Sequence, residues 1–114
     1  MKIDQYAFGK IVIDGKTYTS DVILYPEKVD PSWWRKEGHR LQPEDLETVI
    51  RKKPDILIIG TGNVGAMTVP QETLDYLRSQ GIDVRVARTG KAVDIFNGSQ
   101  KENKKIIAAL HLTC

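Results

Sequence analysis

The chain has 114 residues, close to the size of one domain, so it can bury one core but not a cofactor domain beside a substrate domain. Hydrophobic residues make up 40% and charged residues 28%, a balance typical of a folded globular domain and not of a disordered or membrane chain. The formal net charge of +2 is too small to make nucleic acid or an anionic membrane the default partner.

The N-terminal residues resemble neither a secretory signal nor an organelle presequence, and no apolar run reaches the ~20 residues that a membrane-spanning helix needs. We therefore expect a cytoplasmic protein without membrane insertion. Cys114 is the only cysteine, which rules out a disulfide within one chain and suits a reducing compartment. The two histidines and the carboxylates show no metal-ligand spacing, so we expect no metal and no cofactor.

The first part of the chain, about residues 3–25, has the pattern of an N-terminal β-ribbon. Tyr6 to Ile13 is rich in aromatic and β-branched residues. Asp14-Gly15 is a type I′ hairpin signal, and Lys16 to Leu24 follows it as the returning strand.

Periodicity fails over about residues 26–42, which predicts a long ordered loop. Loops of this length in a compact domain are often functional, and two adjacent tryptophans indicate that this one packs against something. Trp33, Trp34 and Arg35 are our candidates for binding a protein partner. The alternative is that the tryptophans only seal the loop onto the sheet.

From about residue 43 to residue 114, helical and strand patterns alternate. In chain order they are a helix opened by Pro43 and ended by Pro54, a strand over Asp55 to Ile59, a helix opened by Pro70, a strand over Ile82 to Ala87, a helix capped by Thr89 and a strand over Ile106 to Leu112. This order predicts an α/β domain with a largely parallel sheet. We expect residues 1–114 to form a single domain.

A glycine-rich segment, Gly60 to Gly65, matches G-x-G-x-x-G after a predicted strand. A dinucleotide site needs the helix to begin within the glycines, yet Pro70 delays it, and the next strand ends without an acidic residue for a ribose. A glycine-rich turn is the better interpretation.

A simpler anion site is consistent with the same pattern, because parallel strands end at one edge of a sheet. This edge would combine two segments with free N–H groups and positive charge. Its residues are Gly60, Thr61, Gly62, Arg88, Thr89, Gly90 and Lys91. Alternatively, Thr89 only caps its helix and the basic side chains are solvated.

His39 is a weak catalytic candidate, because a histidine among basic residues can act as an acid or base near neutral pH. No sequence neighbour orients its ring, although Asp45 or Glu44 could reach it after folding, and a solvated or capping role fits His39 better. His111 is interpreted as a core or edge residue. Without a complete catalytic constellation, the sequence favours a protein that is not an enzyme.

An ordered series of short matches resembles a family of compact domains of unknown function found in archaea and bacteria. In animals that family includes the adipogenesis-associated domain protein and mitochondrial respiratory complex I assembly factor three. The matching residues are Trp34, Arg35, Gly38, His39, Leu41, Asp45, Leu46, Pro54, Asp55, Gly60, Thr61, Gly62, Pro70, Gly81, Ile82, Thr89, Ala92, Asn97, Ala108, Ala109 and Leu110.

The resemblance implies a three-layer β+α/β/α domain around a mixed, mostly parallel, five-stranded sheet, in which one strand is antiparallel. It supplies no catalytic residues. Its mitochondrial members look like assembly or scaffolding proteins.

We therefore expect a non-catalytic binding or assembly protein whose contact surface combines the Trp33 to Arg40 loop with the Gly60 to Gly62 edge. The rival hypothesis is a small ligand-binding domain or enzyme that acts on an anionic metabolite at the carboxyl edge of the sheet. The partner could also be a second copy of the chain.

Overall fold

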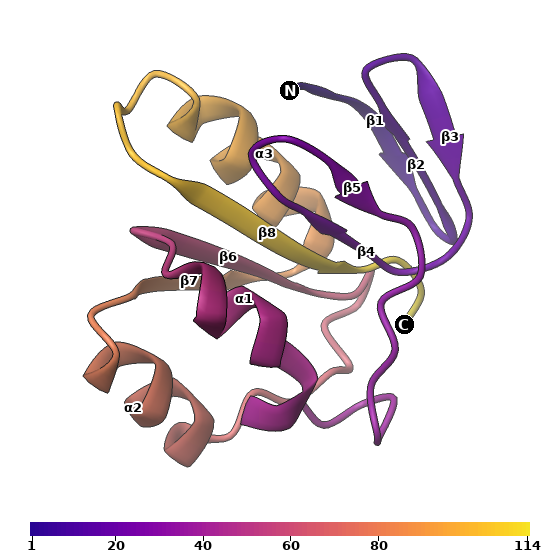
Figure 1. Cartoon of the computed structure of the whole chain (residues 1–114). Coiled ribbons are helices and arrows are strands. Elements are labelled where there is room, and N and C mark those ends of the chain that lie inside the picture. The colour runs from indigo at the N-terminus through magenta and orange to yellow at the C-terminus, as the bar shows by residue number, and fades with distance from the viewer.

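A computed structural model describes residues 1–114, and Figure 1 shows how its β-sheets and helices are arranged. The strands are β1 (Ile3–Ala7), β2 (Lys10–Ile13), β3 (Lys16–Tyr18), β4 (Val22–Leu24), β5 (Val29–Asp30), β6 (Ile56–Thr61), β7 (Asp83–Ala87) and β8 (Ile106–His111). The helices are the short 3-10 helix η1 (Pro43–Leu46) and the α-helices α1 (Glu47–Lys52), α2 (Gln71–Ser79) and α3 (Thr89–Ser99).

The N-terminal ribbon is an antiparallel sheet in the order β1-β2-β3. Asp14 and Gly15 have φ values of 48° and 81°, and both central residues of a type I′ turn need positive φ, so the predicted hairpin is confirmed. The segment from Tyr6 to Ile13, rich in β-forming residues, contributes to two strands. A turn at Phe8 and Gly9 divides it, and the φ of 73° at Gly9 explains how the chain reverses there.

The central sheet has the order β5-β4-β8-β6-β7. Strand β6 runs parallel to both β7 and β8, whereas β4 is antiparallel to β8, so the sheet is mixed and mostly parallel as expected. The β-structure expected over Lys16 to Leu24 supplies strands to two sheets, because β3 belongs to the ribbon and β4 to the central sheet. Residues 19–21 carry the chain between the two sheets.

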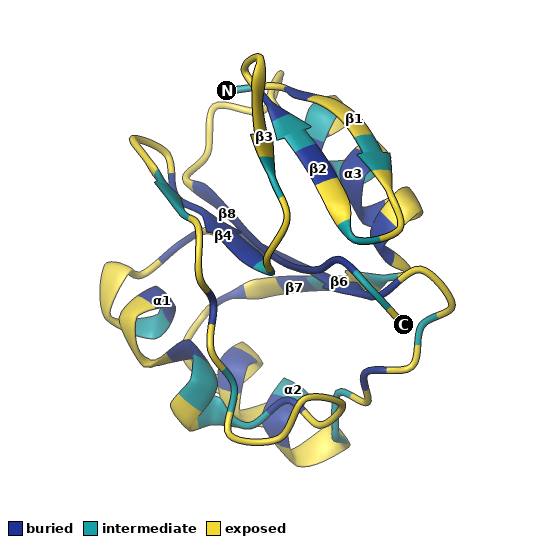
Figure 2. Ribbon diagram, turned by 90° about the vertical axis from the view of Figure 1, so that its right-hand side faces the viewer, coloured by how far each residue is buried: buried dark blue, intermediate teal, exposed yellow.

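Alternate side chains of β6 face opposite sides of the sheet, as the period of a strand requires. Ile56 and Ile58 pack in a core shared with α3 and the ribbon, whereas Leu57 and Ile59 pack in a core shared with α1 and α2. All four are fully buried, and each such side chain stabilises the fold by about 1.5–3 kcal/mol. Figure 2 shows the resulting three layers, with α3 and the ribbon on one side of the sheet and α1 and α2 on the other.

The carboxyl ends of β6, β7 and β8 meet at one edge of the sheet because these strands are parallel. Since β4 is antiparallel to β8, Asp21 at the start of β4 lies at this same edge. The segment from Trp33 to Arg40, called here the tryptophan loop, begins there, where the Trp33 N–H donates to the Asp21 carbonyl at 2.9 Å. No helix combines the length and the apolar character needed to cross a bilayer.

Candidate functional site

A buried charge cluster anchors the tryptophan loop to the end of the sheet. The side chains of Arg35 and Asp21 are only 5% and 18% exposed, and Arg35 Nη1 lies 2.9 Å from Asp21 Oδ2, an ion-pair contact whose angles do not make it a hydrogen bond. The Arg35 Nε and Nη2 atoms also donate to the Gly38 carbonyl at 3.2 and 2.9 Å. The guanidinium therefore joins two points of the loop to the strand edge.

His111, the last residue of β8, is the third member of the cluster and is 4% exposed. Its Nδ1 atom lies 2.8 Å from Asp21 Oδ2 and 3.1 Å from Arg35 Nη2. Nδ1 can donate to the carboxylate only when it carries a proton, and the shorter contact to Asp21 favours that tautomer. The buried Nε2 atom of His111 has no hydrogen-bond partner.

The cluster holds the pKa of Asp21 below its usual value of 3.8. Burial by itself raises this pKa, but the hydrogen bonds from His111 and the Leu112 N–H, together with the electrostatic influence of His111 and of the adjacent Arg35 guanidinium, outweigh it. Asp21 therefore stays ionised and offers two oxygens that fix both the loop and the chain after β8.

His39, the weak catalytic candidate, lies beside this cluster. Its ring packs edge-on against the His111 ring at 5.6 Å between centroids, and its carbonyl accepts the Thr68 N–H at 2.7 Å. The Asp45 carboxylate instead accepts the N–H groups of Lys36 and Gln42 at 3.0 and 2.9 Å. His39 is exposed, and no carboxylate orients its ring.

The two segments of the predicted anion site meet in space, but much of their hydrogen-bonding capacity is used internally. Gly60, Thr61 and Gly62 are buried. The Gly62 N–H donates to Thr89 Oγ1 at 2.9 Å, and the Thr89 hydroxyl donates to the His111 carbonyl at 2.5 Å. Thr89 is the first residue of α3 and is fully buried. The prediction that it caps this helix is wrong, because its hydroxyl forms hydrogen bonds with Gly62 and His111 at the ends of the neighbouring strands.

The rest of the glycine loop binds the chain's own last residues. The Asn63 N–H donates to the Thr113 carbonyl at 2.6 Å, and the Ala66 N–H donates to the Cys114 oxygen at 2.9 Å. A Cβ atom at Gly62 would lie 2.3 Å from the Cys114 carbonyl carbon, so only glycine permits this approach. Gly62 therefore serves a close contact between backbones.

The exposed part of the predicted anion site is Arg88, Gly90 and Lys91. Arg88 forms no ion pair, and its side chain lies over Gly65, with its Cγ atom 3.3 Å from the position of a Cβ atom there. The space around Gly90 is open. These three residues retain charge and free backbone donors at the start of α3.

The two tryptophans have different environments. Trp33 is 7% exposed, its Nε1–H donates to the Asp45 carbonyl at 3.1 Å, and the Arg35 guanidinium lies 4.6 Å from its ring centroid. Trp34 is 76% exposed, the highest value among the large hydrophobic side chains of this protein. Trp33 therefore seals the loop, as the structural alternative expected, whereas the Trp34 ring stays free.

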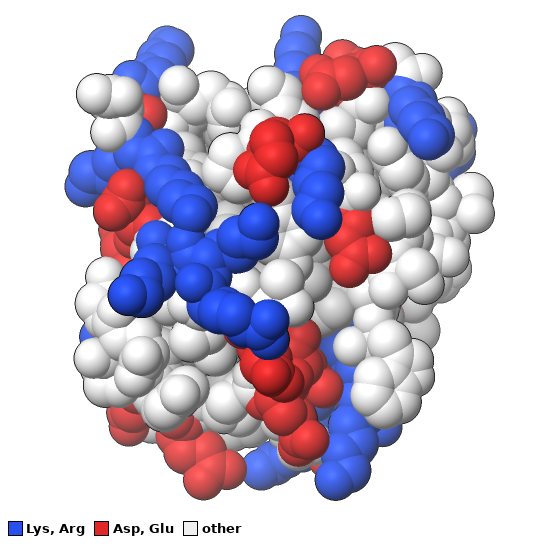
Figure 3. All heavy atoms as spheres, viewed as in Figure 1, with Lys and Arg blue, Asp and Glu red and all other residues white.

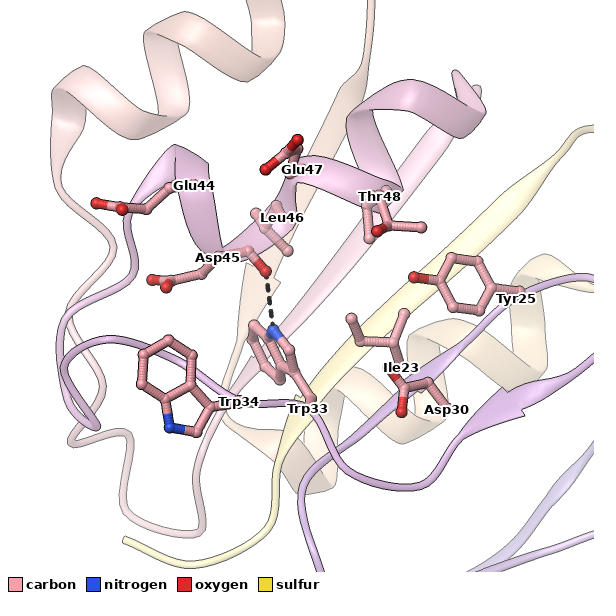
Figure 4. Close-up of a pocket in the computed structure, with 11 residues that line it drawn as sticks. Ile23, Tyr25, Asp30, Trp33, Trp34, Glu44, Asp45, Leu46, Glu47 and Thr48 are labelled. Carbon is pink, nitrogen blue, oxygen red and sulfur yellow. Dashed lines mark hydrogen bonds between the residues drawn. The ribbon is translucent and has the colours of Figure 1, made fainter.

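Both tryptophans line a cavity of about 230 Å³, called here the tryptophan pocket. Figure 4 shows the two indole rings beside η1 and the start of α1, with the Trp33 hydrogen bond to Asp45 dashed. The lining residues are Ile23, Tyr25, Asp30, Trp33, Trp34, Glu44, Asp45, Leu46, Glu47, Thr48 and Val49. The pocket thus combines aromatic walls with four carboxylates.

The carboxylates around the pocket come mainly from the start of one helical segment. Glu44 and Asp45 lie in the first turn of η1 and Glu47 in the first turn of α1, whereas Arg51 and Lys52 occupy the last turn of α1. Figure 3 shows acidic side chains gathered below a group of basic ones on this face of the molecule. The net charge of the chain conceals this local separation.

Sequence reasoning identified the tryptophans and Arg35 but missed Asp21, the place of Glu44 in the pocket and the role of His111. Asp21 and His111 are 90 residues apart, so only the antiparallel pairing of β4 with β8 brings them together. One local signal was available, namely polar residues at the ends of two apolar strands. It does not say which ends meet.

Comparison with known proteins agrees with this fold. A family model described as "Protein of unknown function (DUF498/DUF598)" matches residues 3–111, so the chain belongs to that family. A conserved hypothetical protein from Pyrococcus horikoshii is 28% identical, with a TM-score of 0.81 and 100% of both chains covered.

Two further solved structures share the fold. An outer membrane protein from Bartonella henselae is 24% identical, with a TM-score of 0.82, covering 98% of this chain and 94% of its own. A Bordetella pertussis protein described as a Mth938-like domain is 18% identical, with a TM-score of 0.78, covering 97% of this chain and 85% of its own.

Proposed function

We propose that this member of a family of unknown function is a non-catalytic binding or assembly protein that contacts a protein partner through its tryptophan loop. The observation that carries the proposal is Trp34, which is 76% exposed although the adjacent side chains of Trp33 and Arg35 are buried. Tryptophan is enriched at the energetic centres of protein interfaces.

The loop is held in place before any partner arrives. Arg35 and Trp33 are fixed by the contacts to Asp21, Gly38 and Asp45 described above. A preorganised loop loses little conformational entropy on binding, so the energy gained by burying the Trp34 ring is largely retained as affinity. The exposed ring therefore suits recognition better than a mobile tail would.

The contact surface proposed here is narrower than the sequence predicted. Gly60, Thr61 and Gly62 are buried and bonded within the chain, so they support the edge from inside. Among the exposed residues of the loop after β6, Thr68 contacts the tryptophan loop, because its N–H donates to the His39 carbonyl at 2.7 Å. We also propose a cytoplasmic location, which suits the single cysteine and which fractionation of cells containing the tagged protein would test.

The test is quantitative affinity capture with three versions of the purified chain: wild type, Trp34→Ala and Phe8→Ala. Phe8 is a matched control because its ring is 62% exposed in the ribbon turn, outside the tryptophan pocket. We expect at least one protein to be retained by wild type and Phe8→Ala and lost with Trp34→Ala, and to bind in the same order when purified. Equal retention by all three would contradict the proposal.

A second candidate function is the binding of a small anion at the start of α3. One observation favours it: Arg88 has no ion-pair partner and lies next to the open backbone at Gly90 and Lys91. Titration with inorganic phosphate, followed by amide NMR, should then move the resonances of residues 88–91 in a saturable way. Unmoved resonances there would exclude this candidate.

A further inference from the structure

We propose that the tryptophan pocket receives a lysine or arginine side chain of the protein partner. This inference rests on the proposed function and names the chemistry by which the partner is recognised. It goes beyond an exposed anchor, because it assigns an occupant to the cavity beside Trp34. Three features of the cavity support it: its aromatic walls, its unpaired carboxylates and the place of the protein's own cations.

The walls suit a long side chain that has an apolar stem and a charged end. Ile23, Leu46 and Val49 contribute apolar surface to a cavity of about 230 Å³. The methylene groups of lysine and arginine pack on such surfaces while the charged end stays near water or a counter-charge. An aromatic ring beside the charged end adds a cation–π attraction.

Three carboxylates of the pocket have no basic partner within 4.0 Å, namely those of Asp30, Glu44 and Asp45. Glu47 is the exception, because it pairs with Arg51 at 3.1 Å. Asp30 accepts one backbone N–H, from Ser32, and Asp45 accepts two. In a chain with more basic than acidic residues, this leaves a local negative charge that a cation would complement.

The protein's own cations occupy other parts of the same aromatic group. The Arg35 guanidinium stacks on Trp33, and the amines of Lys28 and Lys52 lie 5.7 and 5.9 Å from the Tyr25 ring. No cation of the chain lies over the Trp34 ring. In Figure 4 the carboxylates of Glu44 and Asp45 are on the side of Trp34 and that of Asp30 is at the other end, beside Ile23, so acidic groups flank the pocket at both ends.

The test is an NMR titration with an acetylated and amidated Gly-Arg-Gly tripeptide, with Gly-Leu-Gly as the uncharged comparison. We expect saturable shifts of the Trp34 indole and of the amides of residues 44–48 with the arginine peptide, weakening as salt is added. In an Asp30→Asn, Glu44→Gln double variant, the dissociation constant should rise about fivefold. Asn at position 30 can still accept the Ser32 N–H, which protects the local fold.

The matched control is Asp94→Asn, which removes an exposed carboxylate of α3 that does not line the pocket and should leave the titration unchanged. Equal shifts with the leucine peptide, or equal affinity of the double variant, would overturn the inference. If Trp34→Ala loses a captured partner while the double variant keeps it, the inference fails and the proposed function stands. If Trp34→Ala loses no partner, the proposed function fails too.

Discussion

Arg35 determines how the tryptophan loop is held, because its buried guanidinium links Asp21 and the Gly38 carbonyl. The attraction between two buried charges is largely offset by the free energy needed to remove them from water, so the pair as a whole contributes little to stability. Removing one partner is strongly destabilising, because the other charge is then buried and unpaired. The same side chain also covers one face of Trp33. Stability and loop position therefore depend on one residue.

Arg35→Ala should lower the free energy of unfolding by about 3 kcal/mol, because it leaves Asp21 charged and partly buried without its partner. Urea denaturation would measure this loss. The control is Arg51→Ala, whose ion pair with Glu47 is largely exposed and should contribute less than about 0.5 kcal/mol. Similar losses for the two variants would show that Arg35 is not an anchor.

Asp21 should titrate below its usual pKa of 3.8, since its hydrogen bonds and charged neighbours outweigh its burial. A carboxyl whose pKa is lowered on folding stabilises the protein above the unfolded value, and that contribution disappears as pH falls through the folded value. Carbon NMR of the Asp21 carboxyl group from neutral pH to about pH 2 would locate the midpoint. A midpoint at or above 3.8 would contradict the cluster as described.

At the scale of elements, the loop after β6 connects α3 with the chain that follows β8 through hydrogen bonds and close contacts. Gly62 contributes to both contacts, through the Thr89 hydroxyl and through its approach to Cys114. Its φ of 107° lies in a region that residues with a Cβ atom rarely adopt. The glycine pattern that resembles a nucleotide loop is thus explained by packing within the chain.

Gly62→Ala should cost about 2 kcal/mol of stability or more, because the added methyl group collides with backbone at an unfavourable φ. Gly98→Ala is the comparison, since Gly98 lies in α3 with open space around it and alanine favours helix by about 0.5 kcal/mol or more. Thermal unfolding of both variants should show opposite shifts. If Gly62→Ala left the stability unchanged, the backbone around Gly62 could move to accommodate a methyl group, which would contradict this prediction.

Sequence patterns predicted the order of helices and strands well where the signal is local, as in the Asp14-Gly15 turn and the apolar β6. They failed where a distant partner decides the structure. Thr89 has the local pattern of a helix cap, yet its hydroxyl bonds Gly62 and His111, which no local pattern shows. The same limit hid Asp21, because its role depends on the pairing of β4 with β8.

At the scale of the whole molecule, the mixed sheet brings five separate segments to one edge. The antiparallel β4 is essential, since it places Asp21 next to His111 and so gives the tryptophan loop a fixed base. A wholly parallel sheet would put the start of that strand at the opposite edge. The fold thereby exposes the Trp34 side chain beside the acidic residues of the tryptophan pocket.

The most direct test of partner binding is photo-cross-linking from position 34. A benzoylphenylalanine placed at Trp34 should link one predominant protein in an extract of the source cells, and excess wild-type protein should compete it away. The same group placed at Phe8, the other strongly exposed aromatic position, should not link that protein. If position 34 yields no specific product, or the same products as position 8, the tryptophan loop is not a binding surface and our account of its function is wrong.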